Sequence, residues 1–308
     1  MSWDRRRVED HLERLSPKRA LLLVNPGARR GGEAVDAATD RLRAAGVEFV
    51  TEELGSAEEL EATLREHAGQ IDVAIVGGGD GSLCRAAQGL IATGTPLGIL
   101  PMGTANDLAR TLGIPDDLGE AADIIIAGHR RTIDLGTVNG HPFFNVASIG
   151  LSVDLARSLD AGMKRRWGRF GYAIAAMRAL ARARRFSAFI TEEGRTWRTS
   201  TMQIAVGNGR FYGGGTVVAA HAEIDDGHLD LSSLELHTVW TLALMLRSFR
   251  SGEHGAWSEV ATARGTEFEI RTRKPLAVNA DGELIAETPA IFKVHPDAVT
   301  VYAPPLTG

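Results

Sequence analysis

The sequence predicts an open, mostly parallel α/β domain followed by a second, β-rich domain. Up to about residue 130, short apolar runs alternate with segments of helical periodicity, as βα repeats do. Three of those runs end in polar, glycine-bearing loops, which an open α/β sheet brings to one edge. After Arg130 the pattern changes to short strands separated by turn signals. We therefore place the domain boundary near residue 131.

Composition limits the class of protein before any motif is considered. The chain has 308 residues and 44% hydrophobic content, enough for a sizeable core and two domains. A formal charge of −5 gives no general attraction to nucleic acid. One cysteine, Cys84, excludes an internal disulfide and fits a reducing compartment. We find no signal-peptide core and no apolar run long enough to span a membrane, and expect a soluble cytoplasmic protein.

Motifs of several common enzyme classes are missing from the sequence. The histidines form neither H-E-x-x-H nor a Cys/His cluster, which argues against a zinc enzyme. No Gly-x-Ser-x-Gly elbow supports a serine hydrolase. The chain also lacks the Gly-Lys pair of a P-loop, and Ser82 stands where the dinucleotide fingerprint starting at Gly77 needs glycine.

The elements of the first half follow from periodicity and from turn residues. Ser56 and Glu59 form a capping box that starts one helix. Thr95-Pro96 leads into the fourth strand. We expect strands at 20–24, 47–51, 73–76 and 97–100, and helices at about 33–45, 56–69, 83–93 and 117–127.

The stretch from Asp72 to Ser82 carries the strongest chemical signal. An apolar strand is followed by three glycines and then by a helix, so free N–H groups are offered to a phosphate. Asp80 places a carboxylate in that loop, where it would repel phosphate unless a divalent cation lies between them or a proton is to be accepted. This conflict points to a kinase, although an ordinary glycine turn is the simpler alternative.

Two further loops follow neighbouring strands. Asn25 to Gly32 contains arginines and glycines that could meet anionic oxygens, or it is an ordinary βα connection. Pro101 to Arg110 contains Thr104, which we expect to be a helix N-cap with Asp107 as its capping partner. Because the carboxyl ends of parallel strands share one edge, the three loops predict one ligand site.

The second half reads mainly as strands. Asn139-Gly140 is a hairpin signal, and Asp226-Gly227 and Asp281-Gly282 have the same form. We expect strands at 132–138, 141–149, 186–191, 198–206, 217–220, 267–273, 276–279, 284–287, 290–295 and 298–302, and helices at 170–183 and 238–249.

The motifs of both halves resemble one known family. Three of them, Asn25-Pro26 with Gly31, Gly78-Gly79-Asp80-Gly81-Ser82 and the 101–110 loop, are similar to the nucleotide-site motifs of the diacylglycerol kinase and sphingosine kinase catalytic-domain family. Asn208-Gly209, the Tyr-Gly-Gly-Gly of residues 212–215 and the Asp-Asp-Gly of 225–227 follow in that family's order. The nearest resemblance is to its soluble bacterial lipid kinases.

The resemblance implies the fold, the domain limits and the cofactors. It implies an NAD kinase/phosphofructokinase-like open sheet that binds ATP, covering 1–131 with a returning segment of about 296–308, and a β-sandwich lipid-substrate domain covering 132–295. The reaction it implies is phosphorylation of a lipid hydroxyl, with diacylglycerol as the family's usual acceptor. The expected nucleotide-site residues are Asn25, Pro26, Gly31, Thr51, Gly78, Gly79, Asp80, Gly81, Ser82, Gly103, Thr104, Asn106 and Asp107.

Acidic turns in the second half supply the remaining expected site residues. By resemblance, Asp226 holds a structural magnesium together with backbone carbonyls at Glu223 and His228, whereas spacing alone favours a hairpin turn at 226–227. The resemblance also makes Glu283 the general base, with Asp281 and Asp80 as rivals or as ligands of a catalytic magnesium.

The chain departs from the family at two places, and other functions stay open beside the family's own. Gly27 to Arg30 replace the usual Ser or Thr in the first loop, and Cys84-Arg85 replace the usual Asn-Glu pair. The alternatives are a kinase for a sphingoid base, ceramide or another lipid, an NAD kinase-like enzyme, and a regulatory module that binds lipid without catalysis.

A basic stretch suggests a partner surface. Eight Lys and Arg residues and no acid lie between Lys164 and Arg185, next to Trp167 and Phe170. This is either a solvated face or a surface that holds the enzyme on anionic lipid at the inner membrane face. The sequence does not indicate an oligomeric state, and a homodimer, the commonest oligomer, is the assembly we consider.

Overall fold

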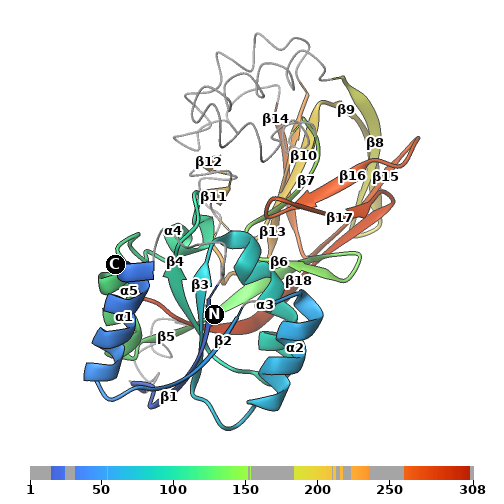
Figure 1. The fold of residues 1–308 in the computed structure, drawn as a ribbon. Coiled ribbons are helices and arrows are strands. Elements are labelled where there is room, and N and C mark those ends of the chain that lie inside the picture. The colour runs from blue at the N-terminus through green and yellow to red at the C-terminus, as the bar shows by residue number, and fades with distance from the viewer. Residues whose placement is uncertain are drawn as a thin grey trace, which may run out of the picture. The chain divides into compact units, whose positions relative to one another are not determined.

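The computed structural model describes residues 15–24, 32–53, 55–151, 153, 184–209, 211–212, 216–217, 223–235 and 260–305 (Figure 1). The expected helices at 170–183 and 238–249, the first nucleotide loop at 25–31 and the basic residues 164–182 lie outside these ranges. Two compact units divide the chain, Met1–Ile133 with Asp297–Gly308, and Asp134–Pro296.

The first unit is a parallel sheet with helices on both faces (Figure 1). Its strands lie in the order β2-β1-β3-β4-β18, and β4 is parallel to both β3 and β18. Helices α1 and α5 pack together, and α2 packs with α3. The elements are β1 (Arg19–Val24), α1 (Gly32–Ala44), β2 (Glu48–Glu53), α2 (Ala57–Glu66), β3 (Val73–Gly78), α3 (Asp80–Thr93), β4 (Leu97–Pro101), α4 (Asp107–Thr111) and α5 (Leu118–Ala127).

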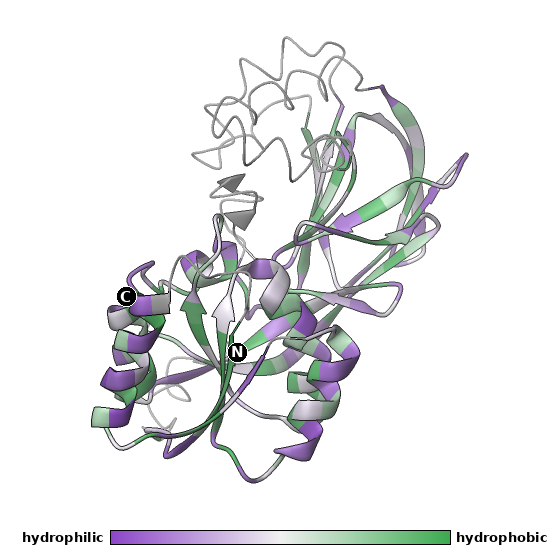
Figure 2. Cartoon of the chain, in the orientation of Figure 1, coloured by the Kyte–Doolittle hydropathy of each residue, from purple (hydrophilic) through white to green (hydrophobic). Residues whose placement is uncertain are grey.

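Apolar patterning explains why these segments form this sheet. Every residue of β3 is buried, and so is every residue of β4, as expected for strands covered on both faces. In Figure 2 the central strands of this unit are hydrophobic, whereas the helices alternate hydrophobic and hydrophilic residues. Ser56 and Glu59 form the predicted capping box, and Asp117 caps α5 by accepting the Glu120 N–H.

Two long strands belong to both units. β5 (Arg130–Val138) begins in the first unit and ends in the second. β18 (Ala290–Tyr302) runs the opposite way, pairing with β15 over Ala290–Lys293 and with β4 at Val301. The sequence predicted β18 as two pieces because His295, Pro296 and Asp297 interrupt its apolar pattern. The strand is continuous because each piece has its own partner strand.

The second unit is a sandwich of two mainly antiparallel sheets. One sheet has the order β14-β13-β10-β7-β16-β17, and the other contains β5, β6, β8, β9, β15 and β18. Side chains from both sheets form one buried core that includes Phe143, Phe268 and Phe292. The remaining strands are β6 (His141–Phe143), β7 (Val146–Gly150), β8 (Phe186–Glu192), β9 (Arg195–Thr201), β10 (Gln203–Gly207), β11 (Phe211–Tyr212), β12 (Thr216–Val217), β13 (Leu229–Leu234), β14 (Val260–Gly265), β15 (Glu267–Thr272), β16 (Ala277–Ala280) and β17 (Glu283–Glu287).

Turn chemistry in this unit follows the predicted hairpin and departs from prediction elsewhere. Asn139 and Gly140 both have positive φ, at 49° and 84°, as a tight hairpin turn between β5 and β6 requires. The single strand expected at 141–149 is instead split into β6 and β7. The strand expected at 198–206 is divided at Met202, whose N–H bonds to Leu234 O.

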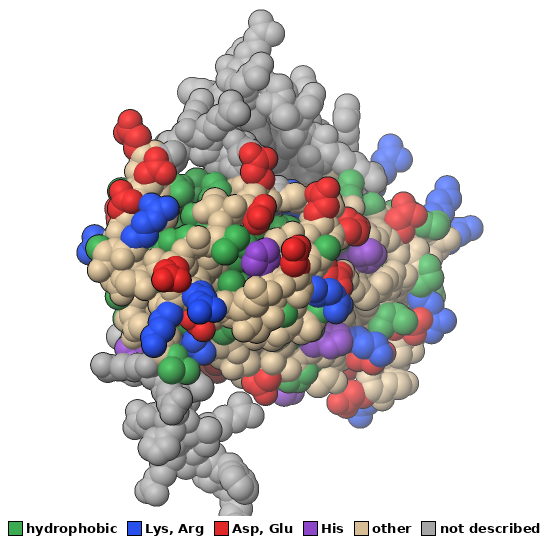
Figure 3. All heavy atoms as spheres, turned by 60° about the horizontal axis from the view of Figure 1, so that its bottom comes forward, with side chains coloured by type: hydrophobic (Ala, Val, Ile, Leu, Met, Phe, Trp, Pro, Cys, Tyr) green, Lys and Arg blue, Asp and Glu red, His purple; other side chains and the backbone are tan. Residues whose placement is uncertain are grey.

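No helix among the described residues is long and apolar enough to cross a membrane. On the face shown in Figure 3, acidic and basic side chains of the described residues are interspersed. That face therefore carries mixed charge rather than a patch of one sign.

Candidate functional site

The glycine loop after β3 and the loop after β4 leave the first sheet side by side. β3 and β4 are parallel neighbours, with Gly78 opposite Pro101 at their carboxyl ends. Met102 then donates its N–H to Gly78 O at 2.9 Å, so the pairing continues past the strands. Two of the three predicted loops are thereby brought to one edge of the sheet, where open α/β sheets bind ligands.

Glycine is required in both loops because their backbones touch. A Cβ added to Gly103 would lie 2.6 Å from the Cα of Gly79, and one added to Gly79 would lie 2.9 Å from the Cα of Gly103. Neither residue has positive φ, so close packing and not backbone conformation demands glycine here. Ser82 packs behind the loop, since its buried side chain lies against Gly78.

Asp80 joins the two loops through its side chain. It is the first residue of α3, and its Oδ1 accepts the Leu108 N–H at 3.0 Å, at the beginning of α4. The carboxylate therefore lies beside the glycine loop, where the sequence placed it, and also fixes the loop after β4. A carboxylate among these backbone N–H groups suits a magnesium ion that accompanies phosphate, because Mg²⁺ prefers oxygen ligands.

Asn106, rather than Thr104, is the N-cap of α4, which corrects the sequence prediction. Asn106 has φ 50°, in the left-handed region that asparagine tolerates better than threonine. Its Oδ1 accepts the Gly103 N–H at 2.8 Å, and its Nδ2 donates to Asp116 Oδ1 at 2.9 Å. Thr104 is exposed, so its hydroxyl can meet a ligand instead of capping the helix.

The other expected nucleotide residues have more limited structural evidence. Asp107 is buried, with Arg110 Nη1 3.6 Å from its Oδ1, so it braces the short helix α4. Thr51 is exposed on β2, opposite Leu22 of β1. Asn25, Pro26 and Gly31 lie outside the described residues, and their nucleotide contact stays a prediction.

Asp281 is held by the backbone of another segment of the second unit. Its carboxylate accepts the N–H groups of Phe144, Asn145 and Val146 at 2.7, 3.1 and 3.0 Å. These bonds explain why the predicted strand at 141–149 is interrupted, since its N–H groups turn to Asp281. Asp281 itself has φ 46° in the turn between β16 and β17.

Glu283, two residues later, has a different environment. It is the first residue of β17, opposite Ala280, and is exposed. An exposed carboxylate on a strand can approach a substrate hydroxyl, whereas Asp281 is engaged in holding backbone. Of the two acidic residues in this turn, Glu283 is thus better suited to accept a proton.

The Asp226 turn tests the predicted structural magnesium. Asp226 Oδ1 accepts the His228 N–H at 3.0 Å, and Oδ2 accepts the Glu223 N–H at 3.4 Å. Arg264 Nη2 also lies 2.6 Å from Oδ2, so a guanidinium already provides the positive charge beside this carboxylate. The Asp226 turn in this chain therefore does not fit a structural magnesium.

Two buried polar residues next to these turns were not among the expected site residues. Asp134 is 2% exposed, and its Oδ2 accepts the Gly227 N–H at 2.6 Å. Asn208 donates from Nδ2 to Asp134 O and to Phe144 O, at 3.0 and 2.9 Å. It thus links the segment that supports the Asp226 turn to the one that holds Asp281. In the sequence, Asp134 is marked only as a polar residue within an apolar strand, and Asn208 only as part of the Asn208-Gly209 motif.

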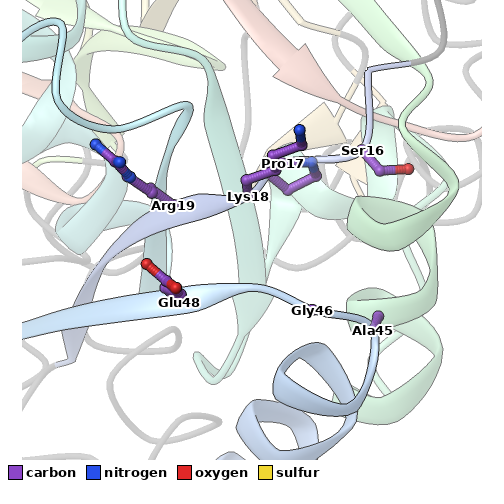
Figure 4. A pocket seen from close by; sticks show the side chains of 7 residues that line it. All are labelled: Ser16, Pro17, Lys18, Arg19, Ala45, Gly46 and Glu48. Carbon is purple, nitrogen blue, oxygen red and sulfur yellow. The ribbon is translucent and has the colours of Figure 1, made fainter.

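A hollow of about 430 Å³ lies at the opposite, amino-terminal edge of the first sheet (Figure 4). β1 and β2 both begin there, so it is separate from the loops that follow β3 and β4. The residues that line it are Ser16, Pro17, Lys18, Arg19, Ala45, Gly46 and Glu48. Because it contains none of the glycine-loop residues, it is not the candidate nucleotide site.

Asp72 fixes the backbone at this amino-terminal edge. Its Oδ2 accepts the N–H groups of Lys18 and Arg19 at 2.8 and 2.9 Å. Burial raises the pKa of Asp72, but the two N–H bonds and the charges of Arg130 and Arg19 outweigh it, and the pKa lies below its ordinary value. The group is structural and far along β3 from the glycine loop.

Comparison with known proteins agrees with this architecture. Residues 19–138 match the diacylglycerol kinase catalytic domain, and residues 145–303 match the YegS C-terminal NAD kinase beta sandwich-like domain. "Probable lipid kinase YegS-like" of Pseudomonas aeruginosa (strain UCBPP-PA14) is 35% identical over 302 residues, covering 93% of this chain and 95% of the relative. "Diacylglycerol kinase" of Staphylococcus aureus (strain bovine RF122 / ET3-1) is 30% identical over 294 residues, covering 93% of each.

A solved structure has the same fold. The crystal structure of a diacylglycerol kinase from Bacillus anthracis str. Sterne has a TM-score of 0.79 at 26% identity, covering 94% of this chain and 99% of that one. The α/β unit with its glycine-aspartate loop and the following β-sandwich, together with these named relatives, place the chain in the lipid kinase class of enzyme. The chain belongs to the diacylglycerol kinase catalytic-domain family, with the YegS type of second domain.

Proposed function

We propose that this enzyme transfers the γ-phosphoryl group of ATP to a lipid hydroxyl, converting diacylglycerol to phosphatidic acid. The observation that carries the proposal is the pair of touching loops after β3 and β4, joined by the Asp80 side chain. Their backbone N–H groups and one carboxylate suit a nucleotide phosphate accompanied by magnesium. The names of the relatives support a lipid as the acceptor.

The residues of this chain divide the work between holding ATP and moving a proton. Backbone N–H groups of the loop from Gly78 to Ser82, with Thr104, hold the phosphates, although the Ser82 N–H itself is donated to Gly79 O. Asn106 and Asp107 keep the second loop in place. Asn25, Pro26, Gly31 and Thr51 contribute to the nucleotide site, as the resemblance implies. Magnesium bound with ATP neutralises phosphate charge, and Asp80 is the ligand we assign to it.

The chemical step forms one bond and breaks one bond. The lipid oxygen bonds to the γ-phosphorus, the bond from that phosphorus to the β–γ bridging oxygen breaks, and ADP leaves. The hydroxyl proton passes to the Glu283 carboxylate, the general base in this proposal. Asp281 has a positioning role, because its three backbone bonds fix the turn that carries Glu283.

Replacement of the general base should slow the reaction without preventing folding. Glu283→Gln is expected to lower kcat by about 10²–10⁴-fold, since the amide cannot accept the proton. Glu287→Gln, an exposed residue at the other end of β17, is the matched control and should keep its activity. Steady-state kinetics at saturating ATP and lipid measures both variants. Full turnover by Glu283→Gln would remove Glu283 from the role of base.

An acceptor screen tests the proposed reaction itself. The full chain is incubated with γ-labelled ATP, magnesium and, separately, diacylglycerol, monoacylglycerol, sphingosine, ceramide, phosphatidylglycerol or NAD. Label in phosphatidic acid supports the proposal. Label only in another lipid would change the acceptor, label in NADP would indicate an NAD kinase, and lipid binding without transfer would indicate a regulatory module.

The basic stretch is our candidate for peripheral contact with anionic lipid. Its support is the sequence alone, eight basic residues without an acid between Lys164 and Arg185. Co-sedimentation with anionic and with neutral vesicles tests this contact. A cytoplasmic location and a homodimer stay predictions alongside it.

A further inference from the structure

We propose that Arg264 takes the place of a structural metal ion at the Asp226 turn, so that the second unit is stabilised by an internal cation. This inference does not depend on the acceptor or on catalysis. It concerns a part of the molecule where the family resemblance predicted magnesium and the side chains show an ion pair instead.

In this turn, a nearly buried carboxylate, that of Asp226, is hydrogen-bonded to the backbone of the turn itself. The Asp226 side chain is 10% exposed, and its two oxygens accept the N–H groups of His228 and Glu223. The Asp134 carboxylate accepts the Gly227 N–H, so a second carboxylate also contacts this turn. Two carboxylates in a poorly hydrated turn require a compensating positive charge.

Arg264 supplies that charge from a defined place in the sheet. It lies on β14, where its register partner is Asp230 of β13, the strand that begins directly after the turn. From there its Nη2 reaches Asp226 Oδ2 at 2.6 Å, the short distance typical of a charge-assisted bond. The arginine side chain is 47% exposed, so the rest of it stays in contact with water.

A magnesium ion on the same carboxylate would be repelled by this guanidinium. Mg²⁺ sits about 2.1 Å from its oxygen ligands, so an ion bound to Oδ2 would lie within roughly 4.7 Å of the Arg264 nitrogen. Like charges at that distance in a partly buried site oppose each other strongly. Arginine and metal are therefore alternatives here, and the hydrogen-bonded arrangement favours arginine.

The test compares unfolding with and without magnesium, in the full chain and without nucleotide. The variants are Arg264→Gln, Arg264→Lys and the control Arg271→Gln, which breaks the exposed Arg271–Glu269 pair on β15 of the same unit. The thermal midpoint of each is measured in EDTA and in magnesium chloride, and bound metal is determined by elemental analysis after dialysis. These measurements do not use kinase activity, so they are independent of the proposed reaction.

If Arg264 replaces the metal ion, the unfolding temperatures and the bound magnesium should follow one pattern. The unaltered chain should hold no stoichiometric magnesium and should unfold at the same temperature in both solutions. Arg264→Gln should lower the midpoint by about 5 °C in EDTA, clearly more than Arg271→Gln, and Arg264→Lys should fall between the two. One bound magnesium per chain with a lower midpoint in EDTA would overturn the proposal. Equal effects of Arg264→Gln and Arg271→Gln would also overturn it.

Discussion

Asp281 and Glu283 are only two residues apart, yet their carboxylates do different things. Asp281 points into the second unit and accepts three backbone N–H bonds, whereas Glu283 is exposed. The sequence could identify this Asp-Gly-Glu turn as important, because the resemblance covers it. The resemblance also made Glu283 the general base and Asp281 a rival. The sequence held no physical reason for that order, since the N–H groups that occupy Asp281 come from residues 144–146, distant in the chain.

The role of Asp281 as a backbone anchor can be tested by stability. Asp281→Asn removes the negative charge and replaces one carboxylate oxygen by an amide NH2 group. That group cannot accept the backbone N–H bonds of residues 144–146. We expect a loss of about 2 kcal/mol in the free energy of unfolding, the scale of hydrogen bonds to a charged group. Urea denaturation measures it, with Glu287→Gln as a variant that should unfold like the unaltered chain. An unchanged unfolding free energy would contradict the anchor role.

Asp72 makes a pH-dependent contribution to stability at the other edge of the first sheet. Its folded pKa is lower than the unfolded value, so its stabilisation is complete above the unfolded pKa of about 3.9 and is lost as pH falls through the folded pKa. Asp72→Asn should therefore destabilise the chain by roughly 1 kcal/mol at neutral pH, because the residue is exposed, and much less in acid. Urea midpoints across this pH range measure the difference. A destabilisation that is the same at every pH would mean that charge is not involved.

At the scale of elements, the site depends on two loops whose backbones are in contact. The glycines and polar residues of both loops were visible in the sequence, and so was their arrival at one sheet edge, because parallel strands require it. The cap of α4 was not predictable from the capping pattern. Asn106 adopts a left-handed conformation because Gly103 and Asp116 both bond to its side chain, and those partners only exist in the folded loop.

Substitution of the contact glycine should disturb the nucleotide loop. Gly103→Ala places a Cβ 2.6 Å from the Gly79 Cα, so the loops must separate, at a cost of about 1–3 kcal/mol. We expect weaker ATP binding, measured by calorimetry, together with lower stability. Gly119→Ala is the control, since its Cβ would meet only side-chain ends, at 3.1 Å from Asp117 and 3.4 Å from Arg41. Unchanged ATP affinity in Gly103→Ala would show that the contact between these loops is not needed for nucleotide binding.

Strand prediction succeeded where apolar residues are regular and failed at edges and junctions. β14 was not predicted, because it is the outer strand of its sheet and most of its side chains are not buried. β18 was predicted in two pieces because polar residues mark its middle. Such errors arise because these strands depend on partner strands that are distant in the sequence, which a local pattern of residues does not show.

At the scale of the whole molecule, the first unit is assembled from two distant parts of the chain. Residues 297–308 belong to it, and Val301 pairs with Leu97 of β4. Val301 and Tyr302 are fully buried, and the Tyr302 hydroxyl accepts from Arg130 and donates to Leu15 O. This segment therefore completes the hydrophobic core of the first unit.

Removal of residues 297–308 should damage the first unit, although the rest of that unit lies at the other end of the sequence. A chain ending at Pro296 is expected to lose cooperative unfolding and ATP binding, because β4 loses a partner strand and buried side chains. A chain ending at Pro305 keeps these residues and is the control. Circular dichroism during heating, with ATP calorimetry, distinguishes them. Normal ATP affinity in the shorter chain would show that β18 is dispensable for the sheet.

The strand β18 also sets the order of events on the ribosome. During synthesis, domains usually fold in the order in which they emerge from the ribosome, the amino-terminal one first. Here the amino-terminal unit waits for its last strand, which is translated only after the whole sandwich. The nascent first unit must therefore remain unfinished, with an unpaired β4 edge exposed to chaperones or to misassociation, until the residues around Val301 have been made.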